Sequence, residues 1–147
     1  MSVRIVLVAS EFNAPIPQRM LEAAERKARS LQATVVDTVR VPGAWELPLA
    51  VQAALARRDV DAVVALGAIV KGQTEHDELI AKAVADALMR LMLDAGKPVG
   101  LGVTGPGMTW EQAEARVSNA ERAVAAAVRA AEVLAASKAR PTRTRRR

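Results

Sequence analysis

The sequence predicts an α/β fold: a three-layer α/β/α sandwich around a four-stranded parallel sheet, flavodoxin-like in topology. Apolar runs of strand length alternate with segments of helical spacing, which is typical of βαβ units. A chain of 147 residues is long enough to bury one hydrophobic core. No internal repeat or linker interrupts the pattern. We therefore expect one domain over residues 1–137, followed by a tail over residues 138–147.

The first half of the chain predicts two strands and two helices. Val3–Ala9 is a short apolar run, the pattern of a buried strand, and Gln18–Leu31 has helical spacing with many charges. Thr34–Val41 alternates and is rich in β-branched residues, which favours a strand. Glu46–Arg57 returns to helical spacing and ends at a polar turn.

The second half repeats the alternation. Val60–Val70 has the character of a buried strand. From Leu79 to Met92 the apolar residues recur in adjacent pairs every four positions, the stripe of a core-facing helix. Val99–Thr104 is the fourth expected strand. Thr109–Ser137 is rich in alanine and helical, with a break expected near Ser118-Asn119.

Composition excludes several classes of site. Hydrophobic residues make up 51% of the chain but aromatic residues only 2%, so we expect a core of small side chains. The chain has no cysteine and one histidine, which excludes disulfides, thiolate sites and a histidine-rich metal site. We expect no metal and no cofactor. No apolar run reaches the roughly 20 residues that span a bilayer, so we expect a cytoplasmic protein with no membrane partner.

The net charge of +5 comes from one end of the chain. Six of the 21 basic residues lie in the last ten positions, which leaves 15 basic against 16 acidic residues elsewhere. The PTRTRRR end of this tail contains Pro141 and no apolar residue. Such a segment cannot bury enough surface to fold, and we expect the tail to be disordered and solvated. The alternative is an arm that binds RNA, an anionic surface or a cargo. Nucleic acid is not expected as a partner of the domain itself.

Unusual residues follow all four predicted strands. In open parallel sheets the ligand site lies outside the carboxyl ends of the strands. The segments there are Glu11-Phe12-Asn13, Pro42-Gly43-Ala44-Trp45-Glu46, Gly67–Asp77 and Gly105-Pro106-Gly107. Because parallel strands end on the same edge, these four segments predict an active site at that edge.

Gly67–Asp77 reads GAIVKGQTEHD and holds the single histidine, His76. Thr74 has the position of a helix N-cap, with Asp77 as its partner in a capping box. The amides of Gly72–Thr74 would then face outward at the positive end of the helix dipole, a site suited to phosphate. His76 would lie in the first turn, where a neutral-range imidazole can transfer protons. The alternative is a surface histidine, which its place at the mouth of the expected cleft disfavours.

Three other segments offer binding groups, each with a plainer alternative. Phe12 presents a flat face to a heteroaromatic ring; the alternative is core packing, which its polar neighbours disfavour. Glu46 can accept hydrogen bonds from a ring N–H or a sugar hydroxyl, or can simply begin a helix. Gly105–Gly107 allows a backbone to approach a ligand closely, or is only a tight loop. The sequence alone does not separate Arg116 from a solvated charge.

Four segments together resemble the lumazine synthase family in its short archaeal-type form. The segments are Glu11-Phe12-Asn13, VPGAWELPLA at Val41–Ala50, GAIVKGQTEHDE at Gly67–Glu78, and Leu101–Val117 with LGVTGPGMT and QAEARV. The second and third are specific as a pair, because they share the family's order and spacing. The resemblance covers Val3–Ala136.

The resemblance implies a transferase of riboflavin biosynthesis. It would condense 5-amino-6-(D-ribitylamino)uracil with 3,4-dihydroxy-2-butanone 4-phosphate to 6,7-dimethyl-8-ribityllumazine, phosphate and water. The resemblance implies that His76 donates and accepts protons, that Phe12 stacks on the pyrimidine, and that Gln73 and Thr74 hold the phosphate. The other substrate-binding residues that it implies are Asn13, Ala44, Trp45, Glu46, Ala68, Ile69, Val70 and Gly72, with Leu101 and Arg116 from the adjacent subunit.

Family members assemble as pentamers, and some as icosahedral 60-mers with sites shared between neighbouring subunits. The implied partners are therefore two small-molecule substrates and further copies of the chain, and the sequence leaves pentamer and shell open. The chain departs from bacterial members at Leu101 and at Asp77-Glu78, where many of them carry aromatic residues. It also lacks a clear counterpart of their second phosphate-site cation, for which Arg122 is the candidate.

Three alternative functions fit the same fold less well. An archaeal-type riboflavin synthase would not need the phosphate-binding character of GQTEH. A non-catalytic shell or binding protein on the same fold would not need Phe12, Glu46, His76 and Arg116 together. A flavin-binding flavodoxin-like module would need a phosphate loop where Glu11-Phe12-Asn13 stands.

Overall fold

The computed structural model describes residues 2–71 and 76–139. One sheet contains β1 (Arg4–Ser10), β2 (Thr34–Val41), β3 (Ala62–Val70) and β4 (Val99–Met108), in the order β2-β1-β3-β4. Every neighbouring pair is parallel. The helices are α1 (Pro15–Ser30), the short 3-10 turn η1 (Ala44–Glu46), α2 (Leu47–Leu55), α3 (Asp77–Ala95), α4 (Trp110–Ala115) and α5 (Asn119–Ala139).

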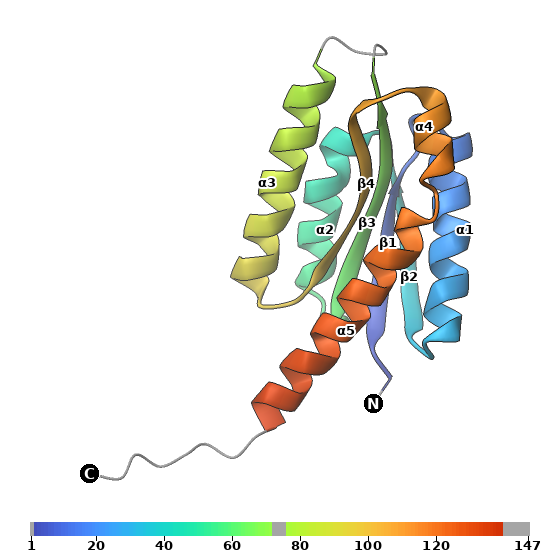
Figure 1. Ribbon diagram of the computed structural model, residues 1–147. Helices are drawn as coiled ribbons and strands as arrows, with labels where there is room; N and C mark the ends of the chain where they lie inside the picture. Colours follow the sequence, from blue (N-terminus) through green and yellow to red (C-terminus); the bar gives the residue numbers. More distant parts are fainter. Residues whose placement is uncertain (1, 72–75, 140–147) are drawn as a thin grey trace.

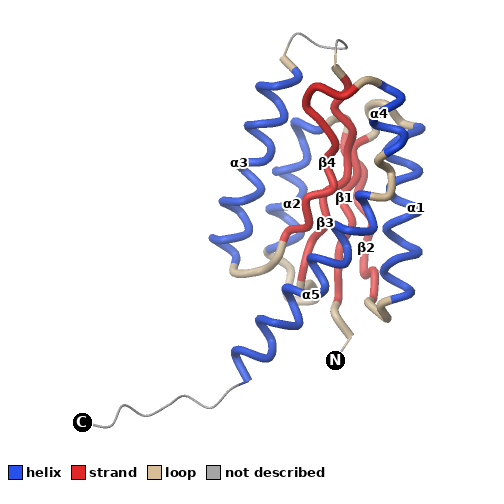
Figure 2. The backbone as a smooth tube through the Cα atoms, in the orientation of Figure 1, coloured by secondary structure: helices blue, strands red, loops and turns tan. Residues whose placement is uncertain are grey.

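The helices form the two outer layers of a sandwich. Helices α2 and α3 cover one face of the sheet, and α1, α4 and α5 cover the other (Figures 1 and 2). The three-layer α/β/α class and the flavodoxin-like strand order are therefore confirmed. The expected break in the last helical segment is also confirmed, because α4 ends at Ala115 and α5 begins at Asn119.

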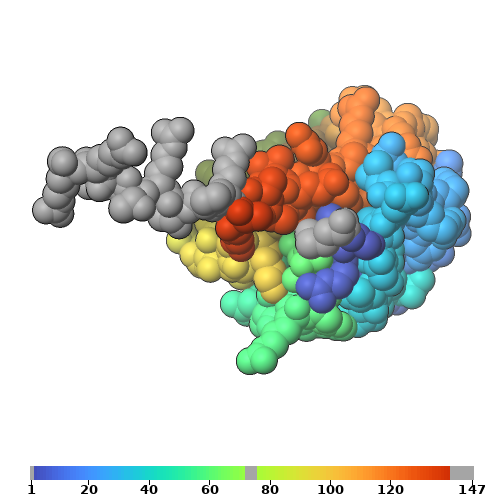
Figure 3. Space-filling model, turned by 90° about the horizontal axis from the view of Figure 1, so that it is seen from below, coloured from blue at the N-terminus to red at the C-terminus, as the bar shows by residue number. Residues whose placement is uncertain are grey.

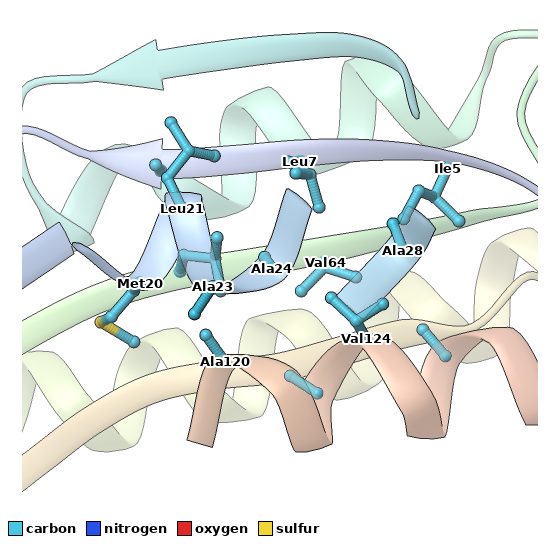
Figure 4. Packing of buried hydrophobic residues seen from close by; sticks show 14 of the residues in the cluster. Ile5, Leu7, Met20, Leu21, Ala23, Ala24, Ala28, Val64, Ala120 and Val124 are labelled. Carbon is cyan, nitrogen blue, oxygen red and sulfur yellow. The ribbon is translucent and has the colours of Figure 1, made fainter. Parts of the chain in front are cut away.

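The core consists of two apolar layers, one on each side of the sheet. Along β1, Ile5 and Leu7 pack in the layer under α1 and α5, whereas Val6 and Val8 pack in the layer under α2 and α3. This is the period-two alternation of a strand that is buried on both faces. On the α1 and α5 side the helices present many alanines to the sheet (Figure 4), which confirms the expected core of small side chains.

Strand β4 lies unusually close to α5. A Cβ atom on Gly100 would stand 2.5 Å from the main-chain oxygen of Ala123, and one on Gly102 would stand 2.7 Å from Leu66 Cδ2. The glycines therefore face the core and allow sheet and helix to touch. Leu101, between them, points to the opposite face, where its side chain is 57% exposed.

The carboxyl end of β4 differs from the expected loop. The strand was expected to end at Thr104, but it continues through Gly105–Gly107 to Met108. Val70 pairs with Met108, and the Lys71 N–H donates to the Met108 main-chain oxygen at 2.7 Å. Pairing with β3 therefore extends the strand across glycines whose φ angles are positive at Gly105 and Gly107.

The starts of two helices also differ from expectation. Helix α3 begins at Asp77, so His76 occupies the N-cap position and not the first turn. The Asp77 carboxylate accepts from the Gly107 N–H at 3.3 Å, and Thr74, the expected N-cap of a capping box, lies outside the described residues. Helix α2 begins at Leu47, because Glu46 belongs to the preceding 3-10 turn.

The opposite edge of the sheet, seen from below in Figure 3, carries ion pairs. Arg4 pairs with Asp61 at 3.1 Å, and Arg57 pairs with Asp37 at 2.8 Å and Asp59 at 2.9 Å. The hydrogen bond from the Arg4 guanidinium is the main reason that the pKa of Asp61 lies below its ordinary value. These groups hold turns at the amino-terminal ends of the strands, away from the edge where a ligand site is expected.

In the described part of the chain, no helix has both the length and the apolar character needed to cross a membrane.

We predict that Gly100→Ala lowers the free energy of unfolding by about 1–3 kcal/mol, because the new methyl group forces β4 and α5 apart. Urea unfolding followed by far-UV circular dichroism measures the change. Ala85→Gly, a half-buried helical position on the opposite layer, calibrates an ordinary single-methyl effect of about 1 kcal/mol. An unchanged midpoint for Gly100→Ala would contradict the close packing.

Candidate active site

A cavity of about 230 Å³ opens at the carboxyl ends of the strands. It is lined by Phe12, Asn13, Gly43, Ala44, Trp45, Ala68, Ile69, Val70 and Ile80. All of these except Gly43 and Ile80 were expected site residues. Segments that are far apart in the sequence therefore meet at one edge, as parallel pairing requires.

Phe12 lies at the rim of the cavity because the chain after β1 is fastened to the end of β2. The Glu11 N–H donates to the Val41 oxygen at 2.7 Å, and the Phe12 N–H donates to the Pro42 oxygen at 2.8 Å. The Phe12 ring is 54% exposed. The expectation of a rim position, and not of core packing, is confirmed.

Asn13 joins the turn after β1 to the end of β3. Its side-chain amide Nδ2 donates to the Ala68 main-chain oxygen at 3.0 Å. Its φ angle is 64°, in the left-handed region that asparagine tolerates better than most residues. Its own main-chain oxygen accepts from the Ile16 N–H at 2.9 Å, at the start of α1. Asn13 thereby fixes the position of Phe12 relative to β3.

The turn η1 forms a second wall. The Glu46 N–H donates to the Gly43 oxygen at 3.1 Å and closes the turn. Trp45 projects from it with 60% of its surface exposed and lines the cavity. The Glu46 carboxylate lies against Gly43, where a Cβ would stand 3.2 Å from Oε1. Glu46 is thus at the site but does not line this cavity.

The floor is the buried end of β3. Ala68, Ile69 and Val70 are each at most 5% exposed. Gly67, just before them, has no room for a side chain, because a Cβ would stand 2.8 Å from Ser10 Oγ. The close contact keeps β1 and β3 in register beneath the cavity.

His76 stands one helical turn from the cavity wall. Its main-chain oxygen accepts from the Ile80 N–H at 2.9 Å, and the Ile80 side chain lines the cavity. The sequence places Ile80 in the core-facing stripe of the helix. Its position four residues after His76 is the signal that could have identified it as a site residue. The other missed residue, Gly43, was visible as the glycine between Pro42 and Ala44.

Other expected residues do not line the cavity. Gly72, Gln73 and Thr74 lie outside the described residues. Leu101 lines a different cavity of about 220 Å³ between α3 and β4. Arg116, at the C-cap of α4, and Arg122, on α5, are both exposed. Within one chain the structure thus separates Leu101 and Arg116 from Phe12.

The cavity suits a flat ring more than a metal. Its walls are apolar, and two aromatic side chains stand at its mouth, which favours stacking on a heteroaromatic group. Within residues 2–71 and 76–139, no three carboxylate or imidazole side chains gather as a metal site would need. Near the floor of the cavity, main-chain groups at the strand ends are the polar groups that a ligand can contact.

The family model described as 6,7-dimethyl-8-ribityllumazine synthase matches residues 2–137. A protein of that name from Methanopyrus kandleri is 51% identical over 127 residues, covering 86% of this chain and 90% of the relative. One from Staphylothermus marinus is 52% identical over 124 residues, covering 84% and 83%. One from Methanothermobacter thermautotrophicus is 45% identical over 127 residues, covering 86% and 91%. The chain therefore belongs to the 6,7-dimethyl-8-ribityllumazine synthase family.

Proposed function

We propose that this chain is a transferase that condenses 5-amino-6-(D-ribitylamino)uracil with 3,4-dihydroxy-2-butanone 4-phosphate to form 6,7-dimethyl-8-ribityllumazine. The observation that carries the proposal is the apolar cavity under Phe12 and Trp45, in a chain that matches the family from residue 2 to residue 137. The relatives' names favour this activity over a riboflavin synthase or a non-catalytic shell protein.

The reaction needs little covalent help from the protein. The substrate amine attacks the ketone carbonyl and water leaves, which gives an imine. The imine tautomerises to an enamine, phosphate is eliminated, and the resulting enol becomes a second carbonyl. The ribitylamino nitrogen attacks this carbonyl, and loss of a second water closes the ring. These steps require proton transfers, an anion site and two reactants held together, and the last effect alone can be large.

We assign ring binding, proton transfer and phosphate binding to separate groups of residues. Phe12 stacks on the pyrimidine, and the ends of η1 and β3 hold its edge and the ribityl chain. His76, at the start of α3, donates and accepts protons. The phosphate is held by Gln73 and Thr74 and by the positive end of the α3 dipole. Arg116 adds a cation, and Arg122 is the candidate for a second one.

We infer that the working site lies between two copies of the chain. Leu101 and Arg116 do not line the Phe12 cavity of their own chain. An apolar groove of about 420 Å³ also lies between α2 and α3, and Trp45 lines both it and the cavity. Leu49, which lines the groove, is 73% exposed, and exposed apolar surface of this kind is typical of an interface. A pentamer or 60-mer in the cytoplasm would cover this surface.

We predict that His76→Ala lowers turnover by about 10²-fold while the protein stays folded and assembled, because general acid–base help has that size. Lumazine formation is followed by absorbance and fluorescence, with the uncatalysed condensation subtracted. Size-exclusion chromatography reports assembly. Wild-type turnover in the variant, or loss of its assembly, would contradict the assigned role.

Mixing two inactive variants tests whether the site is shared. His76→Ala and Arg116→Ala each damage every site in a uniform oligomer. In randomly mixed oligomers, about a quarter of the interfaces join an intact His76 to an intact Arg116, as follows from a head-to-tail interface. We expect co-expressed variants to regain about that fraction of wild-type activity. If both residues served the same chain's site, mixing would restore nothing.

Deleting residues 140–147 separates an enzyme from a tail-dependent binder. We expect unchanged kcat and KM in the truncated chain, because the cavity residues all precede Ala139. The matched control keeps the length but replaces the arginines of the tail by serine. A loss of turnover in the truncated chain would mean that the tail takes part in the site or its assembly.

A further inference from the structure

Asp77 connects the start of α3 to the end of β4. Its Oδ2 accepts a hydrogen bond from the Gly107 main-chain N–H at 3.3 Å, across 30 residues of sequence. Asp77 is half-buried, whereas Glu78, the other acidic residue of this first turn, is exposed. The two carboxylates therefore share the helix dipole but differ in their contacts.

The segment that Asp77 contacts is itself fixed to the cavity floor. Met108 accepts from the Lys71 N–H at 2.7 Å and pairs with Val70. Gly105 packs so closely on the Ile69 main-chain oxygen that no side chain would fit there. Ile69 and Val70 line the cavity. The contact with Gly107 thus ties α3 to residues that form the site.

His76 directly precedes Asp77, so a restraint on Asp77 acts one peptide away from the imidazole. We propose that Asp77 is a positioning residue, which holds His76 at the cavity through its hydrogen bond with Gly107. The proposal rests on the proton-transfer role proposed for His76 above. A misplacement of about 1 Å in a catalytic group can cost on the order of 10²-fold in rate, so a restraint of this kind has a measurable effect.

Two substitutions separate hydrogen bonding from charge. Asp77→Asn keeps an acceptor oxygen at the same distance but removes the negative charge. Asp77→Glu keeps the charge but moves the oxygen by one methylene. If the position of the acceptor oxygen matters, the Asn variant keeps a kcat within about twofold of the wild type. The kcat of the Glu variant then falls about fivefold to tenfold, which is less than the cost of a full misplacement of a catalytic group. If charge alone matters, the order is reversed.

Two further variants and their pH profiles test whether the loss of kcat arises from the position of His76. Glu78→Ala removes a negative charge from an exposed position of the same helical turn; we expect its plateau kcat to match the wild type. Asp77→Ala should lower the plateau kcat about tenfold with little change in the KM for the aminouracil. The full pH profile is recorded for each variant, so that a shift along pH is read separately from a fall in the plateau.

A double-mutant cycle then tests whether the effect of Asp77 is exerted through His76. If Asp77 acts through His76, Asp77→Ala has no further effect in the His76→Ala background. Additive losses would overturn the positioning role while leaving the His76 role intact. An unchanged rate in His76→Ala alone would instead overturn the proposed proton transfer. Thermal unfolding and size-exclusion chromatography of each variant distinguish a local effect from a loss of folding. If Asp77→Ala unfolds, the comparison of Asp77→Asn with Asp77→Glu carries the test.

Discussion

The parallel pairing of β3, with β1 on one side and β4 on the other, positions the segments of the candidate site. Segments on both sides of β3 are hydrogen-bonded near its carboxyl end. Asn13 bonds to the Ala68 oxygen from the β1 side, and Met108 bonds to the Lys71 N–H from the β4 side. Parallel pairing sends every strand's carboxyl end to the same edge. The turns after β1 and β2 and the end of β3 can therefore share one cavity although they are distant in the sequence.

Small side chains give the edge strand β4 two different faces. Gly100 and Gly102 bring its backbone against α5 and Leu66, whereas Leu101 faces outward and is exposed. A strand that is tightly packed on one face and apolar on the other keeps its place in the sheet and still offers a surface to another chain. This arrangement fits the proposal that Leu101 serves a neighbouring site, because its own cavity is separate from that of Phe12.

Within one chain, the cavity offers apolar and aromatic surface and not charged side chains. Its lining includes neither His76 nor Arg116; His76 lies one helical turn before Ile80, which lines it. On the proposed reaction, the apolar walls hold the ring, and proton transfer and phosphate binding come from groups around it. The titratable groups of the opposite edge, such as Asp61 with Arg4, serve the turns there. The two ends of the sheet are thus specialised differently.

The sequence by itself determined the fold class, the order of the elements and the edge at which the cavity lies, because hydrophobic periodicity and strand-end residues are local signals. It also predicted Phe12, Asn13, Trp45 and the end of β3 as neighbours. Tertiary structure alone decided that β4 runs on to Met108, that α3 starts at Asp77, and that Ile80 lines the cavity. Residues far apart in the chain meet at these positions: Val70 pairs with Met108, the Asp77 carboxylate accepts from the Gly107 N–H, and Ile80 lines the same cavity as the end of β3. Propensity rules see only near neighbours, so they do not show that pairing with β3 extends β4 past the glycines that predicted a loop.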